Sequence, residues 1–365
     1  MGRFGNQAEQ FLGALAFTRI LNRTLVLPHW IEYPQRAAGS FQVPFDRYFE
    51  VEPLESYLKV ILMDDFMKYL ANDVWPKGQR IVFCYTSRKN EDNQSEGCNA
   101  KEGNPFGPFW DKFSIDFDQD VFYHPLYFDI SSAGDWNNRY PPSKYPVLAF
   151  TGPPGAFPAE QRHVHLAKYF IYSNYIKKKA ENFLKKHAPK YNQTNLLAIH
   201  LRNGIDFKRA CEYVIPKSNF FASAQCLGYS LEKGIVLSSE ICYPSRNTII
   251  KQVEHAVITH KPDYLFVAAD EDHMIQQFQK TLEKKYNLKV LRYDGNENVN
   301  EAAHIDLYIL GVVANHAIVN CPSTFSAFAK RMRDVNEKQT DFWGLDVNEN
   351  DQKEKIENYE NKIEL

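Results

Sequence analysis

The segment around Arg202 contains residues that suit the binding of a phosphate group. Arg202 follows the apolar run Leu196–Leu201, which we expect to be a buried strand, and it precedes Gly204. The arginine places a permanent cation at the end of that strand, and glycine allows a ligand to approach the backbone closely. Arginine also makes bidentate contacts with phosphate. The residues alone leave open a structural role, in which Arg202 pairs with a carboxylate such as Asp206.

A second segment, residues 320–326, combines hydroxyl groups with a predicted helix start. It contains Ser323, Thr324 and Phe325 between a predicted strand and a helix that begins near Ser326. Hydroxyl and backbone N–H groups at a helix N-terminus can bind an anion. Serine and threonine are also common N-cap residues, so this segment alone does not decide between an anion site and a simple cap.

A third segment, residues 269–272, contains two aspartates separated by one residue. Asp270 and Asp272 follow a predicted strand, and a D-x-D arrangement can hold Mn²⁺ or Mg²⁺ between the phosphates of a nucleotide. Acidic residues after a strand are also typical of helix starts. Because Arg202 already offers a cation to a phosphate, we expect no metal here.

The amino-terminal segment 2–6 places two glycines before a predicted helix. Gly2 and Gly5 flank Arg3 and Phe4, and Asn6 follows. This spacing favours close backbone approach to a ligand. The chain has no G-x-G-x-x-G, G-x-x-x-x-G-K-[ST], G-x-S-x-G or H-E-x-x-H motif. The sequence therefore gives little support to dinucleotide binding of the usual kind, P-loop NTPase chemistry or the common hydrolase mechanisms.

The elements that must hold these segments follow a regular pattern in the second half of the chain. Apolar strands alternate there with helices, which predicts a doubly wound parallel sheet and an α/β fold. In such a sheet, ligands bind beyond the carboxyl ends of the strands. We expect strands at Leu196–Leu201, Tyr264–Ala269, Leu288–Tyr293 and Ala317–Asn320, and helices at Thr248–His260, Met274–Tyr286 and Ala302–Asn315.

The first half of the chain is less regular. We expect a helix over Gln7–Leu21 and, later, one long helix over Ala167–His187. Strands are predicted at Thr24–Leu27, Gln79–Tyr85 and Val147–Thr151, within a region rich in aromatic residues and proline. We place a boundary between two domains near residue 167, within twenty residues, giving domains 1–167 and 168–365. From about Asn348 the tail is charged and polar.

Composition excludes several classes of protein. The chain is 44% hydrophobic and 24% charged, which is typical of a folded globular protein. Its net charge of −2 gives no basic field for nucleic acid. It has no run of 18 apolar residues, so we expect no membrane insertion.

Cysteines and sequons bear on the cellular compartment. The six cysteines form no C-x-x-C pair, so they are either buried thiols or disulfides. Three N-x-[ST] sequons, at Asn22, Asn93 and Asn192, together with the even number of cysteines favour an oxidising compartment.

The two ends of the chain also carry expectations. No signal peptide is visible at Met1, and we expect that the amino end has been trimmed. The last four residues, 362–365 (KIEL), resemble an imperfect K-D-E-L retention signal, although an ordinary charged tail remains the alternative.

Taken in order, three motifs resemble the protein O-fucosyltransferase family, of the type that modifies EGF-like repeats. These are residues 2–7 (GRFGNQ), 200–204 (HLRNG) and 323–326 (STFS), and the stretches 22–25 (NRTL) and 306–311 (DLYILG) are similar as well. The similarity spans nearly the whole chain.

The resemblance implies a fold, an activity and a location. It implies a GT-B architecture, in which two Rossmann-like domains face each other across a cleft. It implies GDP-fucose as the donor and a serine or threonine of a folded EGF-like repeat as the acceptor, in an inverting reaction without a metal or other cofactor. It also implies residence in the lumen of the endoplasmic reticulum. The disulfide pairs that it implies are Cys84–Cys98, Cys211–Cys242 and Cys226–Cys321.

The resemblance also assigns roles to residues. Arg202 is expected to stabilise the departing β-phosphate, and Asn6 to orient the acceptor hydroxyl. The full set expected at the donor comprises Arg3, Phe4, Gly5, Asn6, His200, Leu201, Arg202, Asp306, Ser323, Thr324 and Phe325. We identify no carboxylate that would serve as a general base.

Three other functions are compatible with these residues. One is a fucosyltransferase for thrombospondin-type repeats or glycans, which would share the donor site. Another is a GDP-sugar-dependent binding or chaperone module for EGF-like repeats, which has no need of a cation on the leaving group. The third, a reduced cytosolic nucleotide-binding protein, would be favoured by six free thiols.

Overall fold

A computed structural model of the chain describes residues 2–33, 39–213, 220–229, 236–295 and 299–345. The chain forms two compact units, Met1–Tyr175 and Ile176–Leu365. The division falls within the twenty-residue margin around the expected boundary near residue 167. The charged tail and its last four residues, 362–365, lie outside the described residues. No helix in the part of the chain that the structure describes combines the length and apolar character needed to cross a membrane.

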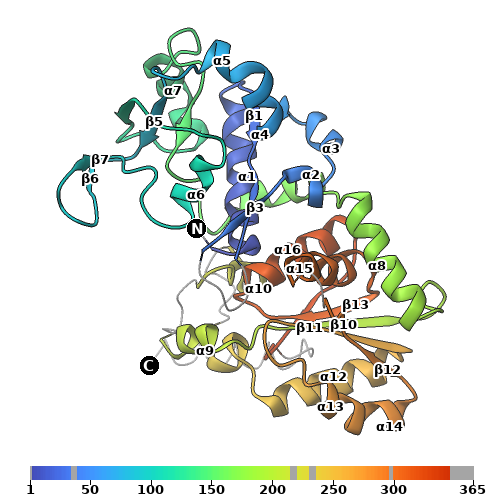
Figure 1. Ribbon diagram of the computed structural model, residues 1–365. Helices are drawn as coiled ribbons and strands as arrows, with labels where there is room; N and C mark the ends of the chain where they lie inside the picture. Colours follow the sequence, from blue (N-terminus) through green and yellow to red (C-terminus); the bar gives the residue numbers. More distant parts are fainter. Residues whose placement is uncertain (1, 34–38, 214–219, 230–235, 296–298, 346–365) are drawn as a thin grey trace. The chain divides into compact units, whose positions relative to one another are not determined.

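The first unit is built from short elements around one long helix (Figure 1). Its helices are α1 (Phe4–Ile20), α2 (Phe45–Tyr48), α3 (Glu52–Glu55), α4 (Met63–Asp65), α5 (Ala71–Val74), α6 (Phe106–Asp111) and α7 (Ala133–Arg139), with the π-helix η1 (Phe66–Leu70) and the 3-10 helices η2 (Ile130–Ser132) and η3 (Gln161–Tyr169). Its strands are β1 (Leu25–Leu27), β2 (Trp30–Glu32), β3 (Phe41–Val43), β4 (Val60–Leu62), β5 (Ile81–Cys84), β6 (Arg88–Lys89), β7 (Glu96–Gly97), β8 (Gln119–Phe122) and β9 (Ala149–Phe150).

Helix α1 is the centre of the first unit because nearly all its side chains are buried. Phe11 stacks on Phe45 of α2 with ring centroids 5.5 Å apart. On another part of the helix, Phe17 belongs to the same apolar cluster as Phe83 of β5 and Trp136 of α7. Aromatic pairs of this kind add packing energy beyond the apolar area that they bury. The aromatic residues of the irregular region therefore form the core of this unit.

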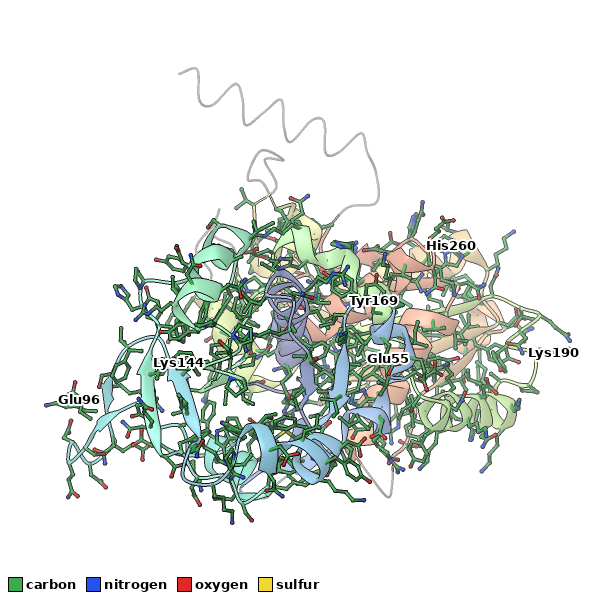
Figure 2. The ribbon with its side chains drawn as sticks, turned by 90° about the horizontal axis from the view of Figure 1, so that it is seen from above. Glu55, Glu96, Lys144, Tyr169, Lys190 and His260 are labelled. Carbon is green, nitrogen blue, oxygen red and sulfur yellow. A yellow bond between two sulfur atoms is a disulfide. The ribbon has the colours of Figure 1, made fainter. Side chains whose placement is uncertain are left out.

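The strands of the first unit pair mostly in parallel. Strand β5 lies between β8 and β9, and β1 pairs with β4. Two short antiparallel pairs, β2–β3 and β6–β7, lie outside these sheets. The exposed side chain of Glu96, in β7, extends outward from this unit (Figure 2).

The second unit has longer and more regular elements. Its strands are β10 (Leu196–Leu201), β11 (Tyr264–Ala269), β12 (Lys289–Leu291), β13 (His316–Val319) and β14 (Asp341–Phe342). Its helices are α8 (Asn174–His187), α9 (Ile205–Glu212), α10 (Ala224–Leu227), α11 (Ser239–Cys242), α12 (Arg246–His260), α13 (Ile275–Phe278), α14 (Lys284–Tyr286), α15 (Val299–Tyr308) and α16 (Thr324–Val335), with the π-helices η5 (Gln279–Glu283) and η6 (Ile309–Val313).

The described strands of this unit form one parallel sheet in the order β12-β11-β10-β13-β14. Side chains alternate between its faces. Leu197, Ile199 and Leu201 of β10 pack with α12 and α13. His200 has the opposite parity and points to α16, where it meets Ser326. Figure 1 shows α12–α14 on one side of the sheet and α8, α15 and α16 on the other.

The sequence prediction was right about strands β10 and β11, to the residue, and wrong about one helix. The expected helix Ala167–His187 is two elements, η3 and α8. They are separated by extended chain, where Tyr172 forms an isolated bridge with Phe49. Phe170 and Tyr172 are buried against the aromatic core of the first unit. This tertiary packing overrides the local helical period.

Candidate active site

The carboxyl ends of β10 and β13 bring together two of the segments singled out from the sequence. The chain runs from β10 outward to β11 and β12, then crosses back to β13 on the other side of β10. The strand order reverses between β10 and β13, and open α/β sheets bind ligands at such a point. Arg202 follows β10 there, and Ser323 lies between β13 and α16.

Arg202 is held by two carboxylates at the end of β10. Its Nη2 lies 2.6 Å from Oδ2 of Asp206, and its Nη1 forms an ion pair with Asp270. The guanidinium also lies over the ring of Phe207, 4.9 Å from the centroid. The Arg202 side chain is 20% exposed. The structural pairing with Asp206 is therefore present, and the partly exposed guanidinium still has further N–H donors for a ligand.

Asp270 organises the backbone beside Arg202. Its carboxylate accepts hydrogen bonds from the amides of Asn203 (2.7 Å) and Gly204 (3.1 Å). A Cβ atom at Gly204 would lie 2.6 Å from Oδ2 of Asp270 and 2.8 Å from Nη1 of Arg202. A side chain at position 204 would displace the charged ends of this ion pair, so glycine suits the Arg-Asn-Gly sequence.

Asp272, the other aspartate of the D-x-D segment, also has protein partners. Its Oδ2 pairs with Nη2 of Arg246 at 2.9 Å, and its Oδ1 accepts the amide of Met274 at 2.8 Å. Both carboxylates of the segment thus bind groups of the chain itself.

His200 is completely buried and neutral. Burial lowers its pKa to about 3, with the nearby charges of Arg202 and His273 acting in the same direction. Its Nδ1 lies 2.8 Å from Oγ of Ser326, and its ring lies 4.5 Å from that of Phe325. The backbone carbonyl of His200 accepts a hydrogen bond from Nε1 of Trp343. His200 thus connects the end of β10 to the start of α16.

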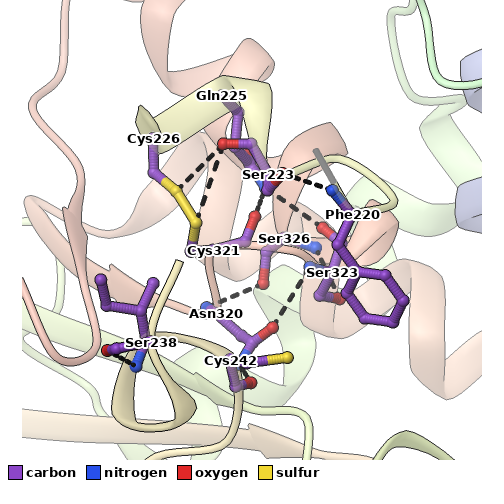
Figure 3. Close-up of a disulfide and its surroundings, with 11 residues drawn as sticks. Phe220, Ser223, Gln225, Cys226, Ser238, Cys242, Asn320, Cys321, Ser323 and Ser326 are labelled. Atoms are coloured by element: carbon purple, nitrogen blue, oxygen red, sulfur yellow. Dashed lines mark hydrogen bonds between the residues drawn. A yellow bond between two sulfur atoms is a disulfide. The ribbon is translucent and has the colours of Figure 1, made fainter. Parts of the chain in front are cut away.

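The loop before α16 is fixed by a dense set of hydrogen bonds (Figure 3). Ser323 is the N-cap of α16, and its Oγ accepts the amide of Ser326 at 3.4 Å. The Ser323 amide donates to Oδ1 of Asn320. Side-chain Nδ2 of Asn320 donates to the carbonyl of Cys242. A capped helix start still presents N–H groups and the helix dipole to an anion.

Asp306 lies in α15 and is buried. Its Oδ1 has no hydrogen-bond partner among the described residues, and burial raises its pKa well above the ordinary value. A buried carboxyl with an unsatisfied oxygen is unfavourable in the ligand-free protein. This property fits a residue whose partner is a ligand, as expected for donor binding.

Leu201 differs from the other expected donor residues in this unit. Its side chain is 2% exposed and belongs to the apolar cluster beneath α12. Its carbonyl accepts the amide of Asp270 at 3.4 Å. The Leu201 side chain therefore packs in the core of the sheet.

The amino-terminal candidates lie in the first unit. The sequence placed residues 2–6 in a loop before a helix, but α1 begins at Phe4, so Gly5 and Asn6 are in its first turn. Arg3 is the N-cap and is exposed. The ring of Phe4 is buried, 5.1 Å from Trp30 and 5.8 Å from Phe49. Phe4 thus anchors the start of α1 in the aromatic core.

All six cysteines form disulfides. The pairs are Cys84–Cys98, Cys211–Cys242 and Cys226–Cys321, the same pairs that the resemblance implies.

The sequons at Asn22, Asn93 and Asn192 are all exposed at the surface. The third lies just beyond α8, near Lys190, which projects outward (Figure 2).

Sequence reasoning missed several residues that shape the site. Asp270 was considered as a metal ligand and instead binds Arg202. Trp343 and Gln225 were not considered, although they hold the carbonyls of His200 and Cys321. No local motif marks these residues, because Trp343 contacts a site segment 143 residues away in the chain and Gln225 one 96 residues away.

Comparison with known proteins gives consistent results along the chain. The family model for GDP-fucose protein O-fucosyltransferase matches residues 1–336. The chain is 38% identical over 343 residues to GDP-fucose protein O-fucosyltransferase 1 of Caenorhabditis elegans, covering 92% of this chain and 85% of that protein.

Solved structures agree with this result. A crystal structure of POFUT1 with GDP-fucose superposes with a TM-score of 0.87 at 36% identity, covering 95% of this chain and 96% of that one. A structure of POFUT1 with GDP gives a TM-score of 0.86 at 36% identity over 94% and 96% of the two chains. The predicted α/β class is confirmed, with parallel sheets in both units as in a GT-B-like glycosyltransferase. By sequence and by fold, this chain belongs to the GDP-fucose protein O-fucosyltransferase family, and it is an enzyme of that family.

Proposed function

We propose that this enzyme transfers fucose from GDP-fucose to a serine or threonine hydroxyl of a folded EGF-like repeat. Membership of the family supports GDP-fucose as the donor, and the name of the family, GDP-fucose protein O-fucosyltransferase, supports a protein acceptor. The observation that carries the proposal is Arg202, whose guanidinium lies at the point of the sheet where a nucleotide is expected to bind.

Arg202 would act on the leaving group. The acceptor oxygen bonds to C1 of fucose while the bond from C1 to the β-phosphate oxygen breaks, and GDP leaves as the acceptor proton is released. Negative charge then grows on the β-phosphate, which the guanidinium stabilises most strongly in the transition state. The start of α16 would bind the phosphates, and Asp306 would accept hydrogen bonds from the nucleoside.

The reaction would proceed with inversion and without a metal. The carboxylates of Asp270 and Asp272 already bind protein groups. The described residues contain no group of three or more His, Cys, Asp and Glu side chains placed to hold a metal ion. Arg202 would supply the positive charge that a cation supplies in metal-dependent transferases.

The enzyme would work in the lumen of the endoplasmic reticulum. Three disulfides support an oxidising compartment. The exposed asparagines of the sequons would be open to glycosylation there.

The direct test is transfer of radiolabelled fucose from GDP-fucose to a purified EGF-like repeat, with EDTA present. We expect label on the folded repeat and little on the same repeat after reduction and alkylation, because a rigid acceptor loses less conformational entropy on docking. Activity that EDTA abolishes and Mn²⁺ restores would contradict the metal-free mechanism. Equal labelling of both forms would contradict shape recognition.

A further inference from the structure

The hydroxyl of Ser326 lies between a backbone amide and an imidazole ring. Its Oγ accepts the amide of Asn320 at 3.0 Å (Figure 3), and it lies 2.8 Å from Nδ1 of His200. Ser326 is completely buried, and its hydroxyl has only these two hydrogen-bond partners among the described residues. Because a hydroxyl has a single proton, these two contacts decide where that proton points.

The Ser326 proton is donated to Nδ1 of His200. A backbone N–H only donates, so the Asn320 amide does not accept this proton. If Nδ1 were itself protonated, Oγ would receive two N–H groups, and its own buried proton would have no acceptor, which is unfavourable. The imidazole has a pKa of about 3, so at neutral pH it carries one N–H. That N–H is therefore at Nε2.

We propose that Ser326 is a positioning residue that holds His200 in the tautomer whose Nε2–H donates to a phosphate oxygen of the nucleotide sugar. The inference rests on the proposed function. Nε2 makes no hydrogen bond within the part of the chain that the structure describes. His200 contacts the first turn of α16, where an anion is expected to bind. The other tautomer would present a lone pair to the phosphate oxygen, which would repel it.

The direction of the His200 ring is also fixed. Its Nδ1 is held by Ser326, and its plane lies 4.5 Å from the ring of Phe325, at an angle of 32°. Nε1 of Trp343 donates to its backbone carbonyl at 2.8 Å. The two ring nitrogens point in different directions, so a bond from Ser326 to Nδ1 directs Nε2 elsewhere. Arg202 would supply the positive charge to the diphosphate, and His200 an uncharged N–H.

Nitrogen NMR of protein that contains ¹⁵N-labelled histidine measures the tautomer directly. The His200 resonances are identified by their loss in His200→Gln. In ligand-free wild type we expect the resonance of a protonated Nε2 and of an unprotonated Nδ1. Saturating GDP should shift the Nε2–H proton resonance, because the hydrogen bond to phosphate forms. A proton on Nδ1 in wild type would overturn the inference.

Two variants of Ser326 test its part in this arrangement. Ser326→Ala removes the hydroxyl, so we expect protonation of Nδ1 to become measurable and the Kd for GDP to rise about fivefold, the effect of one hydrogen bond. Ser326→Thr keeps the hydroxyl, so both the tautomer and the Kd should stay within about twofold of wild type. Wild-type tautomer and Kd in Ser326→Ala would show that Ser326 does not position His200.

Ser223→Ala is the matched control. Ser223 is as completely buried as Ser326, and its Oγ likewise accepts a backbone amide, that of Phe220, at 2.8 Å. The same substitution there should lower Tm to a similar extent while leaving the His200 resonances and the Kd for GDP unchanged. If Ser223→Ala raises the Kd as much as Ser326→Ala does, the effect is one of general stability and the inference is wrong.

The outcomes separate this inference from the function on which it rests. Wild-type protein that does not bind GDP would contradict the proposed function, whatever the tautomer of His200. Wild-type protein that binds GDP without any change at the Nε2–H resonance would support the function and overturn the inference. The tautomer of ligand-free wild type is measured without any Ser326 variant, so it decides the proton's position even where such a variant fails to fold.

Discussion

Replacing Arg202 with alanine removes the guanidinium from the end of β10 while leaving the surrounding backbone supported. Asp206 is 71% exposed in its side chain, so water can solvate it when its partner is lost. Asp270 is 16% exposed but keeps its hydrogen bonds to the amides of Asn203 and Gly204. We expect the free energy of unfolding to fall by about 1–3 kcal/mol, the cost of a partly buried group that loses one partner. The variant should therefore fold.

The loss of catalysis should be much larger than the loss of binding. A donor aimed at charge that develops in the transition state contributes about 2.7–4 kcal/mol, which lowers kcat by about 100- to 1000-fold when it is removed. The same group bound to the ground-state diphosphate, where Asp206 and Asp270 already offset its charge, should contribute about 1.4 kcal/mol, or tenfold in Kd. We therefore predict that Arg202→Ala lowers kcat by a larger factor than it lowers the affinity for GDP.

The assay combines calorimetric titration with GDP and steady-state transfer to an EGF-like repeat. Arg246→Ala is the matched control, because it removes the same guanidinium from a pair with Asp272 whose side chains are 72% and 55% exposed. An exposed pair of this kind contributes about 0–1 kcal/mol, so kcat should change by less than about fivefold. If kcat of Arg202→Ala falls no more than its GDP affinity, the guanidinium only binds the donor, and its role in the transition state is refuted.

Three further predictions concern buried groups and the disulfides. The pKa of His200 is about 3 in the folded state and about 6.5 in the unfolded state, so the unfolded state binds more protons below pH 6.5. In chemical denaturation, wild type should therefore lose about 2 kcal/mol more stability between pH 7 and pH 5 than His200→Gln. An equal dependence of unfolding free energy on pH in the two proteins would contradict a buried neutral imidazole. Asp306→Asn should raise the Tm of ligand-free protein at neutral pH, because it removes a carboxyl whose pKa burial raises in the folded state, and it should weaken GDP binding. A lower Tm with unchanged binding would argue against a ligand-facing role. Non-reducing mass spectrometry of secreted protein should find no alkylatable thiol, and free thiols in the native protein would contradict the luminal location. Replacing both Cys226 and Cys321 with serine should lower the free energy of unfolding by about 2–4 kcal/mol.

The elements that the sequence predicted best are those whose hydrophobic pattern allows one structure. Strands β10 and β11 have the predicted bounds, because a continuous apolar run of six residues between polar segments is typical of a strand buried on both faces. The prediction of one helix over Ala167–His187 was wrong because the local hydrophobic pattern there does not determine the structure. Its first residues have a helical period, but Phe170 and Tyr172 contact aromatic rings from distant parts of the first unit. Local periodicity does not contain that information.

The sequence by itself determined the candidate segments for the chemistry, because arginine, glycine and the hydroxyl residues follow strands whose carboxyl ends lie at one edge of a parallel sheet. Only the tertiary structure decided what these segments touch. His200 meets Ser326 across 126 residues of chain, and Asn203 meets Asp270 across 67. Both contacts follow from a strand order in which β10 lies between β11 and β13. That order is set by the packing of helices on the two faces of the whole sheet, a property that no single segment encodes.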